Sequence, residues 1–361
     1  MKKKMKRRSG NSIVLTITAI VLILAVVAVA ILVSSGYDKQ NSGKRDIITP
    51  AITETASLMT PTVTPAGPTE IATSLTQIIT ATPAPLKTSF MKLHFIDVDQ
   101  GDSILIESDK HYMLIDAGQD EQGSVVVDYL KKQGVKRLDF VIATHPHNDH
   151  IGGLDKVINS FTVDNIIMPS VTSASDNYAE LMNAVAEHKL KITKAEVGNE
   201  YALGEASFVI VSPNSTNYEA LNDYSAGIKL SYGSNSFLLT GDAQKTSEAE
   251  MLKNGIDLSA DVLKLSHHGS STSSSGGFLE KVQPKYAVIS VGADNEYEHP
   301  HSDTMQAMVD RGIKVYRTDK QGTIIFTADG KNITVNAEPY KITASDLTSD
   351  AAEEEAKAKG Y

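Results

Sequence analysis

Short apolar runs separated by turn-forming residues dominate the sequence between residues 90 and 336. Three closely spaced runs, at 92–98, 103–106 and 112–115, predict an antiparallel meander. Further strands are expected at 138–144, 165–168, 208–211, 228–232, 236–240, 262–266, 286–290, 314–316, 323–326 and 333–335, and helices at 125–132, 154–159, 178–188, 246–253, 278–282 and 304–311. A meander followed by alternating strands and helices occurs twice. We therefore expect two mixed sheets packed face to face with helices outside, an α/β fold.

The N-terminus has a different pattern. Residues 1–12 are strongly basic, and residues 13–33 carry no charge and are rich in Val, Ile, Leu and Ala. Because this run is long enough to cross a hydrocarbon core of roughly 30 Å, we expect a transmembrane signal-anchor. A cleaved signal peptide is the alternative, since Ala28 and Ala30 resemble a cleavage site. The basic flank is expected to stay in the cytoplasm, which places the rest of the chain outside the cell.

Composition divides the remaining chain. Residues 34–89 are dominated by Thr, Pro, Ser and Ala, and such a segment buries too little apolar surface to fold, so we expect a disordered stalk. Residues 90–336 are numerous enough to bury a substantial core. Residues 337–361 lack an apolar stripe and are expected to form a solvated tail.

Charge and cysteine content exclude several kinds of site. The net charge of −10 argues against a tight, sequence-independent grip on nucleic acid, although a nuclease could take its positive charge from metals. The chain has no cysteine, which excludes disulfides, thiolate-bound zinc and a cysteine nucleophile. Any metal must be held by His, Asp, Glu or Asn.

The densest cluster of metal-ligand side chains is the run from His145 to His150, His-Pro-His-Asn-Asp-His, in a chain with ten histidines among 361 residues. It lies between a predicted strand and the tight start of a helix. In extended backbone His145 and His147 point the same way, while the turn aims Asp149 and His150 elsewhere. One pair could hold one metal and the other pair a second.

Further polar clusters end other predicted strands: Asp116, Asp242 and the His267–His268 pair. Each could be a simple turn, but together they offer imidazole and carboxylate without sulfur. Such donors suit zinc, manganese or iron, and ligand type does not choose among them.

The chain resembles metallo-β-lactamase-fold hydrolases, and within them the soluble nuclease-like domain of ComEC-type competence (DNA-internalisation) proteins. The resemblance rests on an ordered set of motifs: Phe95–Ser103, Leu114–Gly118, His145–His150, Leu238–Asp242, His267–Ser270 and Asn295–His301. It implies a four-layer αββα sandwich over about residues 91–336.

The resemblance also implies two divalent metal ions, Zn²⁺ with Mn²⁺ as the alternative. His145 and His147 would bind one ion, while Asp149, His150 and either His267 or His268 would bind the other. Asp242 would bridge the two ions, and Asp116 would orient ligands from behind.

Catalytic and substrate roles follow from the same resemblance. Asp149 would orient the attacking hydroxide, and His268 or His301 would meet the charge that develops on the leaving group. Asn295, His299 and His301 are expected to contact substrate.

One departure from the family pattern concerns the metal that His145 and His147 would bind. Many relatives supply another histidine between the main motif and the bridging aspartate, but His188 is the only histidine from 151 to 241 and lies in a polar predicted helix. Water, Asn222 or Asp223 would have to complete this metal's coordination.

Three functions remain open from the sequence. The first is an extracellular, membrane-anchored phosphodiesterase or nuclease acting on DNA or another phosphodiester. The second is a lactonase or β-lactamase-type carbonyl hydrolase. The third is a binding protein with a degenerate metal site. After Val33 no apolar run approaches 18 residues, so the chain lacks the spans of a DNA channel.

Overall fold

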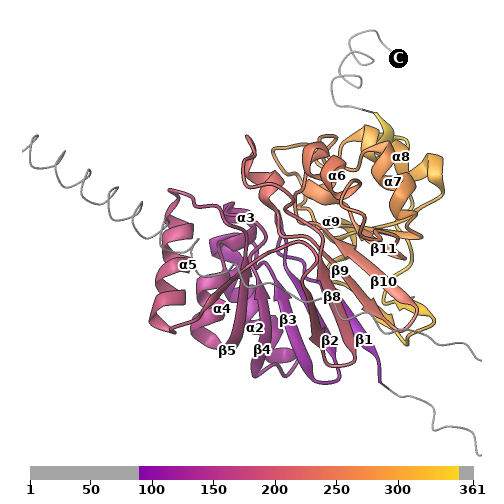
Figure 1. Ribbon diagram of the computed structural model, residues 1–361. Helices are drawn as coiled ribbons and strands as arrows, with labels where there is room; N and C mark the ends of the chain where they lie inside the picture. Colours follow the sequence, from indigo (N-terminus) through magenta and orange to yellow (C-terminus); the bar gives the residue numbers. More distant parts are fainter. Residues whose placement is uncertain (1–88, 349–361) are drawn as a thin grey trace, which may run out of the picture. The chain divides into compact units, whose positions relative to one another are not determined.

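A computed structural model describes residues 89–348, which form two mixed β-sheets packed face to face with helices on both outer surfaces (Figure 1). This confirms the predicted arrangement of layers. The predicted membrane span at 13–33 and all but the last residue of the stalk at 34–89 lie outside the described residues. Within residues 89–348, no helix is both long enough and apolar enough to span a membrane.

The first sheet has eight strands in the order β15-β14-β1-β2-β3-β4-β5-β6. β15, β14, β1, β2 and β3 pair antiparallel, and β3 to β6 pair parallel. Helices α2, α4 and α5 cover its outer face (Figure 1). The strands are β1 (Met91–Phe95), β2 (Ile104–Ser108), β3 (His111–Ile115), β4 (Arg137–Ile142), β5 (Thr162–Met168), β6 (Ile192–Lys194), β14 (Ile324–Ala328) and β15 (Ile333–Val335), and the helices are α2 (Gly123–Lys132), α4 (Leu154–Ser160) and α5 (Asp176–Glu187).

The second sheet has seven strands in the order β13-β12-β11-β10-β9-β8-β7. β7 to β10 pair antiparallel and β10 to β13 pair parallel, so each sheet changes from a meander to parallel strands. The strands are β7 (Glu200–Leu203), β8 (Ala206–Ile210), β9 (Ile228–Tyr232), β10 (Asn235–Leu239), β11 (Val262–Lys264), β12 (Tyr286–Ile289) and β13 (Lys314–Arg317), and the covering helices are α6 (Lys245–Met251), α7 (Gly276–Val282) and α8 (Ser302–Arg311). Short helices complete the fold: η1 (Asp120–Gln122), α3 (Asn148–Ile151), η2 (Leu221–Tyr224), η3 (Ser266–Gly269), α9 (Thr318–Gln321) and η4 (Ser345–Leu347).

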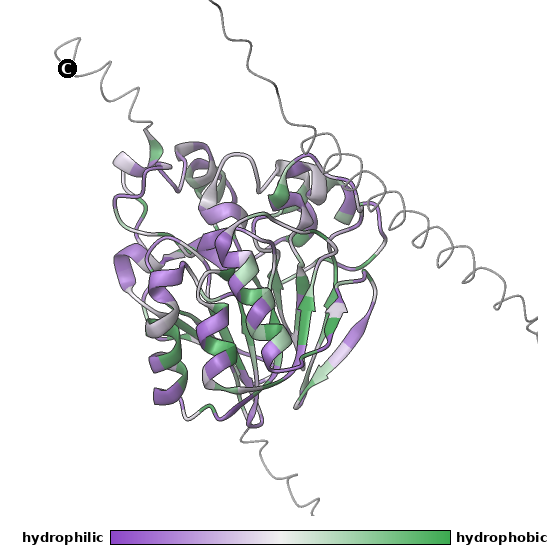
Figure 2. Cartoon of the chain, turned by 90° about the vertical axis from the view of Figure 1, so that its left-hand side faces the viewer, coloured by the Kyte–Doolittle hydropathy of each residue, from purple (hydrophilic) through white to green (hydrophobic). Residues whose placement is uncertain are grey.

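Apolar side chains fill three layers, one between the sheets and one under each set of helices. Alternation along β1 shows how the sequence builds them, since Met91, Leu93 and Phe95 all point into the layer between the sheets. The central parallel strands β11 and β12 are buried along almost their whole length because both of their faces are covered. Figure 2 shows hydrophobic residues along the strands and hydrophilic residues on the outer surfaces of the helices.

The pattern of apolar and polar residues did not predict two of the strands, and it placed the end of one helix too far along the chain. β6 and β7 are short and half exposed at sheet edges, so they carry no apolar run that could predict them. The helix expected to include His188 ends at Glu187, because the chain enters the left-handed region at Lys189 (φ 54°). His188 itself lies on the exposed surface, where its Nε2 is 2.9 Å from Asn159 Oδ1.

Residues after the predicted domain end at 336 contact the folded domain. Tyr340, Ile342 and Leu347 pack against the outer apolar layer of the second sheet, and Tyr340 N donates to Val315 O at 2.7 Å. Asp346 also forms an ion pair with Arg317 at 2.7 Å. Three apolar residues scattered through a polar segment make no recognisable element, so only the tertiary contacts reveal that the domain includes residues up to 348.

Candidate metal centre

The ligand-type residues predicted from the sequence follow the ends of strands that meet at one edge of the sandwich. Asp116 follows β3 and the His145–His150 run follows β4 in the first sheet, while Asp242 follows β10 and His267–His268 follows β11 in the second. Because β3 and β4 run parallel, and β10 and β11 also run parallel, the carboxyl ends of each pair lie at the same edge. Packing the sheets face to face then joins the two half-sites.

Four of these side chains converge: Asp149, His150, Asp242 and His268 each offer one ligand atom, all within 4.8 Å of one another. His150 Nε2 lies 3.2 Å from Asp242 Oδ2, and His268 Nε2 lies 3.1 Å from Asp149 Oδ2 and 3.4 Å from Asp242 Oδ2. The sequence left His267 and His268 as alternatives. The geometry favours His268, because its Nε2 belongs to this cluster, whereas His267 Nε2 lies 3.2 Å from the Asn222 amide nitrogen and its Nδ1 lies 2.9 Å from the Thr272 hydroxyl.

The donor atoms in this cluster fit a divalent cation. His150 Nε2 and Asp242 Oδ1 are buried and have no hydrogen-bond partner in the described structure. Leaving two such groups unsatisfied is costly. Nitrogen and oxygen donors at this spacing are the set that zinc and manganese accept in proteins.

Electrostatics inside the cluster favour charged carboxylates. Burial opposes ionisation of Asp242, but the neighbouring His150 and His268 hold its pKa well below the usual range. The pKa of Asp149 is lowered in the same way. Burial would also lower the pKa of His268, yet Asp242 and Asp149 outweigh it and raise that pKa to about 10. Both carboxylates are therefore ionised at neutral pH, the state in which they bind metals.

His145 and His147 form an adjacent pair, with His145 Nε2 3.0 Å from His147 Nδ1 and 4.0 Å from Asp242 Oδ2. Burial, reinforced by the nearby His150, lowers the pKa of both imidazoles. Neutral imidazoles present the lone pairs that a metal requires. His145 and His147 therefore lie close enough together to be two ligands of one metal, as expected from the sequence. Asp242 lies beside this pair and beside the cluster of Asp149, His150 and His268.

Asn222 and Asp223, the predicted substitutes for the missing histidine, take different roles. Asn222 lines the same cavity as His147, and its buried Oδ1 has no hydrogen-bond partner among residues 89–348. Asp223 Oδ1 instead accepts from the backbone N–H groups of Gln244 and Ser247 at the start of α6. Asp223 is thus committed to the helix, and Asn222 offers the free oxygen.

Asp116 lies directly behind the cluster, fully buried. It accepts from Thr144 N at 2.9 Å and Thr144 Oγ1 at 2.6 Å, and its Oδ2 lies 2.8 Å from His150 Nδ1. Holding Nδ1 fixes the ring with Nε2 toward Asp242. This contact places Asp116 where it can orient His150, the role that the family resemblance implies for it.

Sequence reasoning missed a buried ion pair between Asp102 and Lys264. Asp102 Oδ2 lies 2.8 Å from Lys264 Nζ, and both side chains are 2% exposed or less. The same carboxylate lies 3.7 Å from His268 Nδ1 and 3.9 Å from His150 Nδ1. The available signal was a lysine inside the apolar strand β11, an unusual place for an unpaired charge.

Glycine allows the loop around Asp102 to pack on the metal-binding turn. Gly101 has φ 142°, and a Cβ there would lie 2.3 Å from the carbonyl oxygen of Asp149. Asp102 N donates to that same oxygen at 3.0 Å. The Gly-Gly pair after the histidine run serves a similar purpose, since a Cβ at Gly153 would meet Ala117 O at 2.5 Å.

A cavity of about 320 Å³ opens onto the cluster. Its lining is polar apart from one aromatic ring and consists of Gln100, His147, Asn148, Asp149, Asn222, Asp242, His267, His268, Tyr297 and His299. Of the three residues predicted to contact substrate, His299 is the one that lines this cavity.

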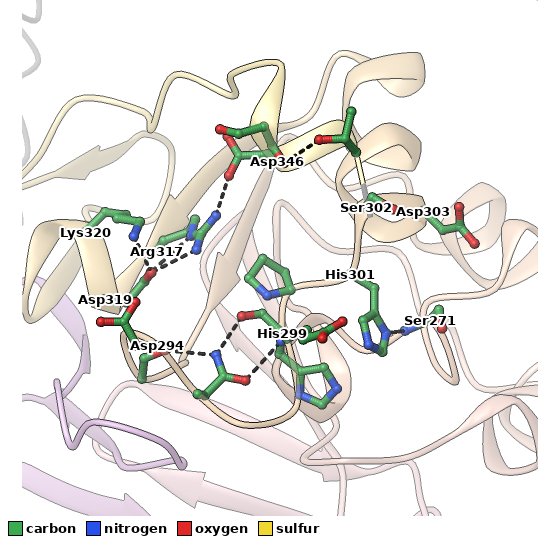
Figure 3. Close-up of a pocket in the computed structure, with 16 residues that line it drawn as sticks. Ser271, Asp294, His299, His301, Ser302, Asp303, Arg317, Asp319, Lys320 and Asp346 are labelled. Carbon is green, nitrogen blue, oxygen red and sulfur yellow. Dashed lines mark hydrogen bonds and ion pairs between the residues drawn. The ribbon is translucent and has the colours of Figure 1, made fainter. Parts of the chain in front are cut away.

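Asn295 and His301 lie elsewhere. The Asn295 side chain donates to Gly292 O and His299 O and accepts from His299 N, so it holds the loop that carries His299. His301 Nδ1 accepts from Ser271 N at 2.9 Å and lines a neighbouring cavity of about 400 Å³, shown in Figure 3. The structure places neither side chain in the lining of the metal-site cavity, although the His301 ring lies 4.8 Å from the His299 ring. Their substrate contacts, and the leaving-group role considered for His301, stay predictions.

Comparisons with known proteins agree with this geometry. Residues 96–293 match the sequence profile of the metallo-beta-lactamase superfamily. The chain is 30% identical over 282 residues to ComE operon protein 3 of Bacillus subtilis, covering 73% of this chain and 36% of that protein. It is 31% identical to Recombination protein 2 of Haemophilus influenzae, covering 59% of this chain and 26% of that protein.

The chain thus spans about a third of the length of the curated relatives it matches. Among solved structures, the metallo-beta-lactamase fold protein YhfI from Bacillus subtilis aligns with a TM-score of 0.47 and 13% identity, covering 66% of this chain and 100% of that one.

Proposed function

Since the chain belongs to the metallo-beta-lactamase superfamily, we propose that it is a metal-dependent hydrolase that cleaves phosphodiesters in the manner of a nuclease. The observation that carries this proposal is the convergence of Asp149, His150, Asp242 and His268 with buried donor atoms that lack partners. The choice of phosphodiesters is supported by the relative from Haemophilus influenzae, which is named Recombination protein 2.

The proposed ligands form two groups. Asp149, His150, Asp242 and His268 would hold one ion, and His145 and His147, with Asn222 in reach, would hold a second, weaker one, Zn²⁺ or Mn²⁺. When bound, such ions lower the pKa of a water from 15.7 to about 7 and offset the negative charge of the phosphate.

The reaction adds water across one P–O bond. The water oxygen bonds to phosphorus, the bond to the leaving oxygen breaks, and that oxygen takes the proton released by the water. Asp149 is the most exposed carboxylate of the cluster, with a side chain 23% exposed, and its oxygen faces the cavity, where it can accept a hydrogen bond from the attacking water. Asp116 holds His150 through Nδ1, and the Ser290 carbonyl oxygen, 2.8 Å from His268 Nδ1, holds His268.

The chain is further proposed to be anchored in the cell membrane by residues 13–33, with the hydrolase domain outside the cell, as its hydrophobic pattern predicts. Protease added to intact cells tests this. Digestion of the domain with survival of the basic N-terminal flank would support it, whereas full protection would refute it.

Metal analysis combined with substrate assays tests the proposed reaction. The purified protein should bind divalent metal and cleave single-stranded DNA and bis(p-nitrophenyl) phosphate, with both activities lost in Asp149→Ala. Asp128→Ala provides the control, because Asp128 is 69% exposed on α2. Cleavage of a lactone or a cephalosporin alone would refute the phosphodiesterase proposal. If the protein neither bound metal nor cleaved any of these substrates, the remaining alternative would be a binding protein with a degenerate metal site.

A further inference from the structure

An exposed aromatic ring stands at the mouth of the metal-site cavity. Tyr297 is 53% exposed, the highest value among the large apolar and aromatic side chains of the described residues that are counted as exposed. Its ring stacks on His299 with centroids 5.6 Å apart and an interplanar angle of 25°. His299 in turn lies 6.3 Å from His268 at 30°. Three nearly parallel rings therefore lead from solvent down to the candidate metal ligands.

The loop that carries Tyr297 is held in place at several points. Two of the three Asn295 hydrogen bonds fix the backbone N–H and carbonyl of His299, which is only 8% exposed, and the third joins Asn295 to the Gly292 carbonyl oxygen. Gly292 packs on the loop before Asp102, where its N–H donates to Gln100 Oε1 at 3.1 Å. These contacts fix the loop on both sides of Tyr297, and the ring itself rests on His299.

The remaining lining of the cavity offers little to hold a polyanion. Its ten residues include no lysine and no arginine, and the chain carries a net charge of −10. Basic side chains that displace counterions from the phosphates, the usual source of nucleic-acid affinity, are therefore missing from the lining of this cavity. Stacking of bases on aromatic rings is the other general source, and it does not require a basic surface.

We propose that Tyr297 is a stacking platform for a nucleobase, which makes single-stranded nucleic acid the substrate class of this site. This inference rests on the proposed phosphodiesterase function. A base flanking the scissile phosphate lies on the exposed face of the Tyr297 ring while the phosphate enters the cavity beside Asp149. Bases within a duplex are already stacked and hydrogen-bonded, so the platform selects unpaired strands.

Kinetics on matched substrates test the platform. Each variant is assayed on an oligothymidine and on the same oligomer with abasic residues, and the readout is the ratio of the two kcat/KM values. Tyr297→Ala should lower this ratio about 5- to 150-fold, the equivalent of about 1 to 3 kcal/mol of stacking, and Tyr297→Phe should restore it. Phe90→Ala, which removes an exposed aromatic ring from the start of β1, should leave the ratio unchanged.

A second measurement needs no turnover. The chain contains no tryptophan, so Tyr297→Trp introduces a single fluorescent reporter at the platform. Its emission should be quenched by the oligothymidine and not by the abasic oligomer, and binding should depend only weakly on salt. Phe90→Trp should show no quenching with either.

The two readouts separate this inference from the function on which it rests. Phosphodiester cleavage with an unchanged ratio in Tyr297→Ala, or equal quenching by both oligomers, would overturn the platform and leave the hydrolase. Base-dependent quenching without any cleavage would support the platform and overturn the hydrolase.

Discussion

Replacing Lys264 with Met is the sharpest test of how the centre is held together. Lys264 Nζ lies 2.8 Å from Asp102 Oδ2 and within 3.5 Å of two backbone carbonyl oxygens, and its side chain is fully buried. The substitution keeps most of the side-chain volume and removes the charge. The Asp102 carboxylate then remains buried without its partner, near His150 and His268.

The expected cost follows from this burial. At 2.8 Å and an effective dielectric constant of about 20, the two charges attract by about 6 kcal/mol, which offsets the several kcal/mol needed to desolvate each ion. Removing one partner of such a pair leaves the other desolvation cost uncompensated, so Lys264→Met should lower the free energy of unfolding by about 3 to 5 kcal/mol. Domains are stable by only about 5 to 15 kcal/mol, so the loss is large.

Urea unfolding followed by circular dichroism measures this loss. Lys285→Met is the matched control, because Lys285 makes an equally short contact with Asp261 but is 72% exposed, and it should cost less than about 1 kcal/mol. Adding Asp102→Asn to Lys264→Met should recover about 2 kcal/mol or more, since the uncompensated charge is gone. A Lys264→Met midpoint equal to that of wild type, or a double variant no more stable than the single one, would refute the reasoning.

Three further predictions address other parts of the domain. Gly101→Ala should push Asp149 out of place and lower metal affinity about 10- to 100-fold by calorimetry, whereas Gly134→Ala, with positive φ but no atom within 4 Å of the new Cβ, should not. Burial lowers the pKa of His94 from 6.5 to about 4, so the unfolded state takes up a proton at a higher pH than the folded state does. The free energy of unfolding should therefore drop by about 3 kcal/mol between about pH 6.5 and pH 4. The same drop in urea titrations of His94→Gln would contradict this. Tyr340→Ala should lower the free energy of unfolding by about 1 to 3 kcal/mol. An unchanged melting temperature would indicate instead that the residues after 336 form a solvated tail.

Periodicity was sufficient to predict most of the fold because its strands and helices are buried on defined faces. β9 (Ile228–Tyr232) alternates buried and half-buried positions, and α8 follows its predicted range closely. The pattern failed where burial was partial, as in the edge strands β6 and β7, or where single apolar residues act alone, as Tyr340 does.

The sequence by itself determined the chemistry of the centre. Six consecutive residues from His145 to His150, together with an absence of cysteine, restrict any metal to nitrogen and oxygen ligands. That restriction depends only on which side chains are present, so no fold is needed to establish it.

Only the tertiary structure decided which of these side chains meet. His267 and His268 are adjacent and chemically identical, yet His268 Nε2 contacts Asp149 and Asp242 while His267 Nδ1 contacts Thr272. The Asp102–Lys264 pair joins a loop before β2 of the first sheet to strand β11 of the second, and the two residues are more than 150 positions apart in the chain. Such contacts depend on how the two sheets pack, and no local pattern of apolar and polar residues encodes that packing.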